Sequence, residues 1–452
     1  MTQAKHLRLV TPSSRKRSRI TTAQWITIAV AILCVIGVIM VGSASSVISM
    51  TLYGSPWAIF IRELIWIIAG TVTFYLCTRI HYEAWRRWIP IVLFGTFGLL
   101  LIVMVPGLGV ASGGSSRWIG YGLLRIQPSE LMKLALALFI AHFLALKQEA
   151  GVPLKRLLGP LCCVTGAAVV LVVAQPDLGT AMVLMVILVS MLVAADVPKV
   201  VLAKGMGVVI VGVTVLAFAM PYRRARMTSF LNPWGHATTT GYQVVQSLIG
   251  LGSGHLVGLG LGNSREKWGL LPNAHTDFIA SVIGEELGLV GIIAVLCILG
   301  FLISKGLRAA REAPDRFSAY LAVGLITWIG AEAIINIGAA LDVLPVTGIP
   351  LPFISFGGSS LVITMAAAGI LVNISKQSMS QPTRSASPKP RSSTASPTAR
   401  KGTRPSPNKA PASKRASIAS KPRSSATAAS QRIGSSSRRP VQAPSTRQRK
   451  AR

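Results

Sequence analysis

Charged residues are scarce in this sequence, and acidic residues are the scarcest. The 452 residues include 14 Asp and Glu against 46 Lys and Arg, and charged residues make up 13% of the chain. Soluble proteins have about 25% charged residues. Because 51% of the residues are hydrophobic, the composition excludes an ordinary soluble enzyme and also a wholly disordered chain.

The sequence also lacks the patterns of several other classes. The five cysteines lie inside apolar runs without metal-ligand spacing, so we interpret them as small hydrophobic residues. The alternating strands of a membrane β-barrel are missing as well. We expect no cleavable signal peptide, because the first apolar run, which starts near Trp25, is long enough to span a membrane.

Long apolar runs are what the sequence does contain. Each is close to the length needed to cross about 30 Å of hydrocarbon. They predict an all-α integral membrane protein with about ten transmembrane helices, near residues 23–43, 58–78, 88–105, 128–146, 157–174, 178–195, 200–220, 277–304, 317–341 and 352–375.

The distribution of basic residues predicts the orientation. When both termini are placed in the cytoplasm, the inner segments of the membrane domain hold most of its Lys and Arg residues. Four segments then face outward: 106–127, the turn at 175–177, the large loop 221–276 between the seventh and eighth helices, and 342–351. Long loops in a compact body are usually functional, so we expect binding or chemistry on the outer side.

The two ends of the chain are basic and polar. We expect a cytoplasmic head at 1–21, the membrane domain at 22–376 and a disordered cytoplasmic tail at 377–452, and no acidic residue follows Asp342. The high pI therefore reports mainly the tail, and we expect no nucleic-acid partner. The tail could bind anionic lipid of the inner leaflet or dock an acidic cytoplasmic partner.

Lys133 is an ionisable residue inside a predicted membrane helix, where a charge is costly. It follows Glu130 by three residues, so the two side chains share a helix face. Lys133 could simply pair with Glu130 or extend toward the outer interface. Alternatively, it is a buried cation that positions an acid or binds a phosphate.

Asp277 stands at the start of the predicted eighth helix. A helix amino terminus stabilises a carboxylate, so Asp277 could be a cap. Thr276 is an equally good cap, which would leave Asp277 free to face the bundle. On that interpretation Asp277 and Glu285 lie on one helix face and present two carboxylates to a polar cavity. An ion pair between Lys133 and Asp277 would reduce the cost of burying both charges.

Other polar residues are expected around the same outward-facing cavity. Gln175 and Asp177 lie in the turn at 175–177, and Glu332 and Asn336 are four apart on the ninth helix and share its face. The three prolines of 344–353 require an extended or re-entrant path, which is tolerable at membrane depth only where it lines a cavity.

Two further motifs have competing interpretations. Arg117 and Trp118 could form an interfacial anchor, or Arg117 could hold a pyrophosphate. Gly258, Gly260 and Gly262 form a Gly-x-Gly-x-Gly run, but no predicted strand precedes it, so we do not expect nucleotide binding.

Taken in order, several segments resemble the SEDS family (shape, elongation, division and sporulation) of bacterial cell-wall polymerases. The resemblance covers about 25–376 and is carried by 115–119, 127–133, 175–180, 275–288 and 345–360. Residues 43–47 and 258–267 resemble the division branch, FtsW, more than the elongation branch, RodA, and the basic tail resembles that of actinobacterial FtsW proteins. Three positions depart from the usual pattern: Asn273 replaces Glu, Glu332 replaces Gln and Phe356 replaces Tyr.

The resemblance implies a peptidoglycan glycosyltransferase that polymerises lipid II at the outer leaflet. By analogy, Asp277 is the catalytic carboxylate and acts as a general base on the acceptor hydroxyl, Lys133 orients it, and Arg117 is the candidate for the pyrophosphate charge. The substrate-binding residues implied by the resemblance are Arg117, Trp118, Glu130, Gln175, Asp177, His275, Thr276, Glu285, Asn336, Ser355 and Ser359.

The resemblance also implies partners and a location. They are lipid II, a class B penicillin-binding protein that acts as transpeptidase, and other division proteins, at the septum of the bacterial cell membrane. No cofactor is certain, and a divalent cation, Mg²⁺ or Mn²⁺, could neutralise the leaving group. The alternatives are a lipid II flippase, for which we find no inverted repeat, an elongation polymerase, and a non-catalytic scaffold.

Overall fold

The computed structural model describes residues 20–112, 115–120, 125–207, 212 and 221–380 of the chain. The predicted head and nearly all of the predicted tail lie outside these residues, although the last helix continues to Ser380. The described elements are, in order, α1 (Thr22–Tyr53), α2 (Ala58–Arg79), α3 (Tyr82–Val103), β1 (Val110–Ser112), β2 (Ser115–Trp118), α4 (Pro128–Glu149), α5 (Leu154–Ala174), α6 (Leu178–Ala194), α8 (Pro221–Leu231), η1 (Trp234–His236), α9 (Tyr242–Ser253), η2 (Glu266–Trp268), α10 (Ile279–Arg311), α11 (Arg316–Ala340) and α12 (Ser359–Ser380).

The helical membrane architecture predicted from the sequence is confirmed. Among the described residues, eight helices are long and apolar enough to cross a membrane, namely α1 to α5 and α10 to α12. The shorter α6 is also apolar and has 17 residues. The predicted seventh span, 200–220, falls largely outside the described residues, so the count of ten stays a prediction.

Local sequence signals explain where several helices begin. Thr21 and Gln24 form a reciprocal capping box at the start of α1. Pro128 occupies the first turn of α4, where its missing N–H costs nothing. Asp177 caps α6 by accepting the Thr180 N–H at 3.2 Å. Of these ends, the starts of α4 and α6 form part of the candidate site.

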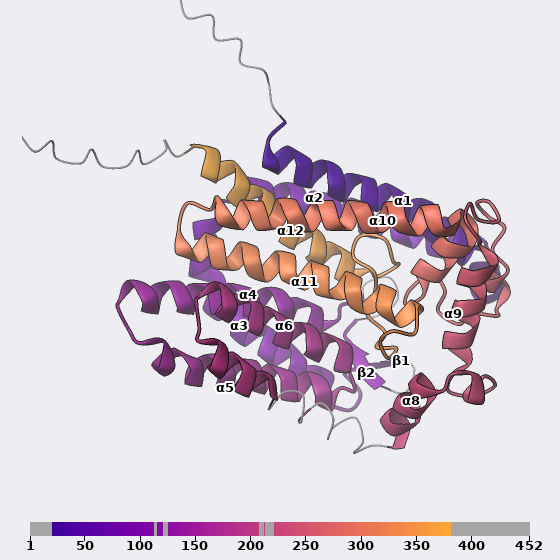
Figure 1. Ribbon diagram of the computed structural model, residues 1–452, viewed down its shortest axis with the longest axis horizontal. Coiled ribbons are helices and arrows are strands. Elements are labelled where there is room, and N and C mark those ends of the chain that lie inside the picture. The colour runs from indigo at the N-terminus through magenta and orange to yellow at the C-terminus, as the bar shows by residue number, and fades with distance from the viewer. Residues whose placement is uncertain (1–19, 113–114, 121–124, 208–211, 213–220, 381–452) are drawn as a thin grey trace, which may run out of the picture. The chain divides into compact units, whose positions relative to one another are not determined.

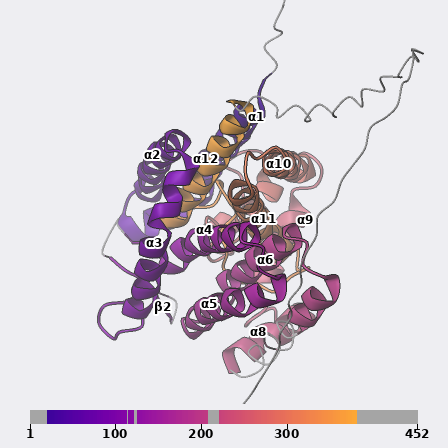
Figure 2. The same cartoon turned by 90° about the vertical axis from the view of Figure 1, so that its left-hand side faces the viewer.

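Helix α11 lies at the centre of the described bundle. It packs against α4, α6, α10 and α12, and Figure 2, which looks along the helices, shows it between them. Fully buried side chains such as Phe317, Trp328 and Ile329 lie along it. Its polar residues Glu332 and Asn336 are buried in the same way.

The candidate site lies at the end of the bundle that carries α8, α9 and the β1–β2 hairpin (Figure 1). The hairpin is antiparallel and pairs Val110 with Trp118; the sequence analysis did not predict it. Residues 343–358 form no regular helix, as their three prolines predicted, and α12 starts only at Ser359 rather than at 352. This irregular segment packs at the same end of the bundle.

Helix α10 is interrupted at Gly288. The backbone of Gly288 has φ 67° and ψ −166°, a conformation available essentially to glycine alone. Residues 255–260 pack against this break, because a β-carbon on Gly288 would lie 2.4 Å from the Gly258 nitrogen. The large loop 221–276 is thereby attached directly to a membrane helix.

Candidate active site

Lys133 is buried between α4 and α11. Its side chain is 1% exposed, and its Nζ lies 2.7 Å from Glu130 Oε2. The second ion pair of Lys133 is with Glu332, and its Nζ also lies 4.9 Å from the centre of the Trp328 ring. In the described part of the chain, the ion pairs of Lys133 are thus with Glu130 and Glu332, and not with Asp277 as the sequence suggested.

Glu332 therefore has a clear structural partner. Both Glu130 and Glu332 are almost fully buried, and two carboxylates surround one ammonium group. Isolated buried charges are very costly, whereas hydrogen-bonded opposite charges can be accommodated. The cluster of Glu130, Lys133 and Glu332 ties α4 to α11 just beneath the candidate site.

Asp277 lies in a turn before α10 rather than in the helix. The helix begins at Ile279 with Phe278 at its N-cap, so the prediction that Thr276 caps the helix is wrong. The carbonyl of Asn273 accepts the N–H groups of Thr276 and Asp277, both at 3.1 Å, and the Thr276 hydroxyl at 3.1 Å. Asn273 itself has a φ of 59°, which Asn tolerates well. These bonds define the Asp277 turn, residues 273–278.

Asn336 fastens the Asp277 turn to the irregular segment 343–358. Its Nδ2 donates to the Asp277 carbonyl at 2.9 Å and to the Ile349 carbonyl at 2.8 Å. A β-carbon on Gly348 would lie 3.6 Å from Asp277 Oδ2, so the carboxylate is beside this glycine. The sequence named Asn336 as a substrate-binding residue. Both hydrogens of its amide are bonded to backbone, which makes it a clamp, and the predicted contact with substrate stays a prediction.

His275 and Ser355 also join these two segments. The Phe356 N–H donates to the His275 carbonyl at 3.0 Å, and the two rings lie 5.7 Å apart. Burial lowers the pKa of His275 to about 4, so this imidazole is neutral near pH 7. Ser355 Oγ accepts the Leu351 N–H at 2.8 Å, which stabilises the bend that follows Pro350.

The amino termini of α4, α6 and α12 meet beside this region. The Gln127 N–H donates to Ser359 Oγ at 3.2 Å. Gln127 Nε2 and Ser129 Oγ both donate to Asp177 Oδ2, each at 3.0 Å. Helix amino termini carry partial positive charge, and the Asp177 carboxylate lies among the donors of this junction.

Arg117 holds the turn at 175–177. Its Nε donates to the Gln175 carbonyl at 3.0 Å, and its Nη2 donates to the Pro176 carbonyl. Gln175 Nε2 in turn donates to the Leu100 carbonyl at 2.9 Å. Arg117 and Trp118 are both half-buried on β2. The structure thus gives Arg117 an anchoring role and leaves its predicted contact with pyrophosphate untested.

Glu285 and Glu286 face the large loop, and the prediction that Asp277 and Glu285 share a helix face is wrong. Glu285 accepts the Ser264 hydroxyl, the Arg265 N–H at 2.8 Å and the Glu266 N–H at 3.5 Å. Glu286 Oε1 accepts the Ser43 hydroxyl at 2.6 Å and the Ser264 N–H at 3.3 Å. These two glutamates pin residues 264–266 to α10 and α1.

Glu266 adds a third carboxyl group at this place. It is 2% exposed, and its Oε2 has no hydrogen-bond partner among the described residues. Burial and the neighbouring charge of Glu285 raise the pKa of Glu266 to about 7. The site thus contains a carboxyl group in the large loop that titrates near neutral pH.

Comparison with known proteins decides the family. The family model for FtsW, RodA and SpoVE, described as "Cell cycle protein", matches residues 24–380. The chain belongs to the FtsW/RodA/SpoVE family. It is 39% identical over 358 residues to a protein of Geobacter metallireducens named "Probable peptidoglycan glycosyltransferase FtsW", covering 78% of this chain and 94% of that one.

Two further similarities support the membership in the FtsW/RodA/SpoVE family. Stage V sporulation protein E of Bacillus subtilis is 38% identical, with 77% of this chain and 95% of the relative covered. A solved structure described as "Structural coordination of polymerization and crosslinking by a peptidoglycan synthase complex" matches with a TM-score of 0.65 and 25% identity, over 79% of this chain and 98% of that chain.

Some site residues of this FtsW/RodA/SpoVE protein were not predicted individually. Gly348 beside Asp277, Ser43 beside Glu286 and the buried Glu266 lie in segments that carry the family resemblance, but no role was predicted for them. Trp328 precedes Glu332 by four residues, so helical spacing could have found it. No spacing rule could have found Ser43, because it lies 243 residues from its partner Glu286.

The residues that the structure describes do not bring three Asp, Glu, His or Cys side chains together as a metal site. One cavity of about 10 Å³ lies between the 350–357 segment and the start of α12. That space holds about one water molecule, so it is not itself the polar cavity that the sequence predicted.

Proposed function

We propose that this protein polymerises lipid II into glycan strands as a peptidoglycan glycosyltransferase, and that it does so in septal cell-wall synthesis. The observation that carries the proposal is the 39% identity over 94% of a relative named as such a transferase. The arrangement around Asp277 supports it, because a half-buried carboxylate is held on a fixed turn at the end of a membrane bundle.

In the proposed reaction Asp277 is the general base. Its carboxylate takes the proton of the acceptor sugar 4-hydroxyl as that oxygen attacks the anomeric carbon of the donor. The new glycosidic bond forms as the bond from the anomeric carbon to the lipid pyrophosphate breaks, so the configuration is inverted. A carboxylate is a modest base, and positioning supplies much of the rate. The clamp by Asn336 supports this role, since it fixes the turn.

Lys133 acts on Asp277 indirectly in this proposal. Lys133 binds Glu332, and Asn336 follows Glu332 by one turn on the same face of α11. The buried cluster holds α4 against the helix that carries the clamp. Lys133 is therefore a positioning residue, and its effect on catalysis passes through α11.

The pyrophosphate leaving group needs positive charge. The junction of the α4, α6 and α12 amino termini supplies partial positive charge, and the guanidinium of Arg117 lies at the turn that starts α6. A guanidinium has five N–H donors, so Arg117 can hold this turn and still donate to a phosphate. The described residues gather no three-ligand metal site, and no step here runs through a divalent cation.

We also propose a membrane topology and partners for this protein. The chain is a multi-pass membrane protein, and we place both termini in the cytoplasm. The partners we propose are a class B penicillin-binding protein and other division proteins. One relative with a solved structure is described as part of a complex that polymerises and crosslinks. This description supports the penicillin-binding protein as a partner. For the tail we propose anionic lipid or an acidic cytoplasmic partner.

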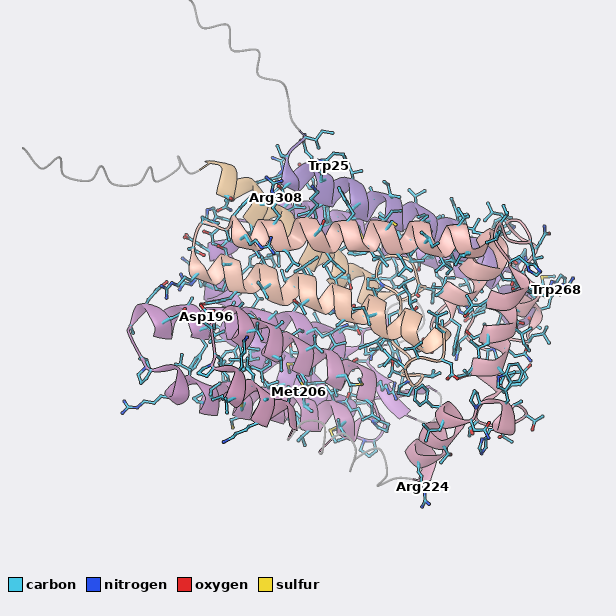
Figure 3. The ribbon with its side chains drawn as sticks, in the orientation of Figure 1. Trp25, Asp196, Met206, Arg224, Trp268 and Arg308 are labelled. Carbon is cyan, nitrogen blue, oxygen red and sulfur yellow. The ribbon has the colours of Figure 1, made fainter. Side chains whose placement is uncertain are left out.

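The test is polymerisation of purified lipid II in liposomes by the full chain with its cognate transpeptidase. We expect glycan strands from the wild type and none from folded Asp277→Asn, which preserves shape but removes the base. Asp196→Asn is the matched control, because Asp196 is exposed and lies at the opposite end of the bundle (Figure 3). It should polymerise like the wild type.

Two outcomes would contradict the proposal. If the wild type makes no glycan but moves lipid II between leaflets, the protein is a transporter. If Asp277→Asn polymerises as fast as the wild type, Asp277 serves only the structure of its turn, and the site assignment fails while the activity stands.

A further inference from the structure

Residues 255–260 of the large loop are hydrogen-bonded to the break in α10. The N–H groups of Leu289 and Val290 donate to the carbonyls of His255 and Leu256, at 3.0 and 3.2 Å. In the other direction, the N–H groups of Leu259 and Gly260 donate to the carbonyls of Glu285 and Glu286, at 2.9 and 3.0 Å. These four hydrogen bonds fix the position of the loop along the axis of α10.

This pairing supplies hydrogen-bond partners to the backbone groups that the helix break leaves free. A helix that breaks in an apolar environment leaves N–H and C=O groups without partners, and each unpaired group costs several kcal/mol. Here the loop backbone satisfies the groups freed at Gly288. The contact is close because both sides carry glycine, and a β-carbon on Gly258 would lie 2.2 Å from the Glu286 carbonyl oxygen.

Two of the three side chains at the tip of this loop, residues 255–257, are apolar and exposed, and the third is the exposed His255. Leu256 is 65% exposed and Val257 is 79% exposed. The adjoining surface of α10 is exposed and apolar too, through Leu289, Val290 and Ile293. Because α10 is long and apolar enough to cross a membrane, we expect these exposed apolar residues to face lipid. The loop tip continues that surface without a gap, since its backbone is bonded to Leu289 and Val290.

The composition of the loop also favours contact with lipid. Residues 227–264 contain no Asp, Glu, Lys or Arg, so the loop tip lies inside a long uncharged stretch that ends at Arg226 on one side and Arg265 on the other. Trp268, a residue type enriched at membrane interfaces, is 71% exposed and lies at the same end of the molecule (Figure 3).

We propose that the loop tip, residues 255–257, is inserted into the lipid leaflet on the side of the large loop. Its ligand is the lipid surface itself, and Leu256 and Val257 are the inserted side chains. The insertion anchors the loop segment that leads to the Asp277 turn. This inference rests on backbone pairing and exposure at α10 and does not depend on the reaction proposed above.

Spin labelling of the purified full chain in phosphatidylcholine–phosphatidylglycerol vesicles tests the proposal. Nitroxides are attached at Val257→Cys, at Ile293→Cys as the lipid-facing reference, and at Asn263→Cys as an exposed polar reference in the same loop. Exposed native cysteines are first replaced by alanine, at Cys162, Cys163 and Cys297. None of the labelled side chains is buried, so folding should be unaffected.

We expect the label at Val257 to behave like the label at Ile293. It should collide often with dissolved oxygen, which concentrates in lipid, and rarely with a water-soluble nickel chelate. If the label at Val257 instead meets the chelate as readily as that at Asn263, the tip is in water and the proposal is wrong. If both reagents are excluded, another protein surface covers the tip, and the lipid assignment is equally overturned.

Discussion

At the scale of single residues, the buried Lys133 offers a sharp test of stability. Lys133→Met removes the only cation that the described residues place against Glu130 and Glu332, and leaves two buried acids unpaired. Breaking a buried pair in this way costs about 3–5 kcal/mol. We expect a large drop in the midpoint of thermal unfolding. Glu332→Gln keeps the pair with Glu130 and should cost much less; equal losses would contradict the cluster.

The clamp formed by Asn336 should affect catalysis. Asn336→Leu removes both donors of the clamp and frees the Asp277 turn from Ile349. We expect kcat for lipid II polymerisation to fall at least tenfold, which corresponds to about 1.4 kcal/mol of barrier, with a smaller change in KM. Asn373 is the control: it is also buried and donates to the Thr78 carbonyl at 3.0 Å, outside the site. Asn373→Leu should lower stability but leave the kcat of the folded protein unchanged.

Glu266 predicts a dependence of stability on pH. Its pKa is raised in the folded protein to about 7 from an ordinary value of 4.5. The folded state therefore binds a proton more tightly than the unfolded state, and this contribution to stability is complete below pH 4.5 and is lost as the pH rises through 7. Glu266→Gln cannot ionise. We expect it to unfold at a higher temperature than the wild type at pH 8, with the difference shrinking toward pH 5; a pH-independent difference would contradict the assignment.

Sequence spacing predicted contacts within a helix but not between helices. The spacing of Glu130 and Lys133 correctly indicated a shared face, because three residues make nearly one turn. The choice of Glu332 as the second partner depends on how α4 packs against α11, which no local pattern contains. Asp277 was placed in a helix because the apolar run begins there, yet the bonds to the Asn273 carbonyl hold it in a turn.

At the scale of elements, the structure shows what the glycine run at 258–262 does. Gly258 and Gly262 both have positive φ, but only Gly258 has backbone atoms where a β-carbon would lie. Gly262→Ala should cost only the left-handed backbone penalty of about 1–2 kcal/mol. Gly258→Ala also pushes the loop off α10, so we expect a clearly larger loss in thermal unfolding. Equal losses would mean that the loop does not need its contact with the helix break.

Element boundaries were predictable where a cap or a proline marked them. Pro128 and the three prolines of 344–353 act through the backbone, so the start of α4 and the irregular segment followed from sequence. The ends of α1 and α3 did not. Helix α1 runs to Tyr53, ten residues past its predicted end, and α3 starts at Tyr82 rather than at 88. The extra residues of α1, 44–53, mix Ser and Thr with apolar residues, and the extra residues of α3, 82–87, include Glu and Arg, so no continuous apolar run marks either end.

At the scale of the whole molecule, hydropathy predicts the architecture well for a general reason. Lipid offers no hydrogen bonds, so a spanning segment must satisfy its own backbone and becomes a helix. The order of the helices in space is less accessible, because every span is apolar on several faces. Helix α11 lies at the centre because it packs against α4, α6, α10 and α12. In the sequence, only its polar pair Glu332 and Asn336 indicated that this helix is buried.

Orientation is the property of the whole molecule on which the proposed function depends. We expect Trp268→Cys to react with a membrane-impermeant maleimide added to intact cells, and Lys199→Cys to react only after the membrane is opened. Both side chains are exposed. The exposed native cysteines are replaced by alanine as above, and reaction of both sites after opening shows that each is reachable. The opposite pattern would place the Asp277 turn in the cytoplasm. Lipid II could then not be polymerised at the outer leaflet by this site, because a charged pyrophosphate and its sugars do not cross hydrocarbon unaided.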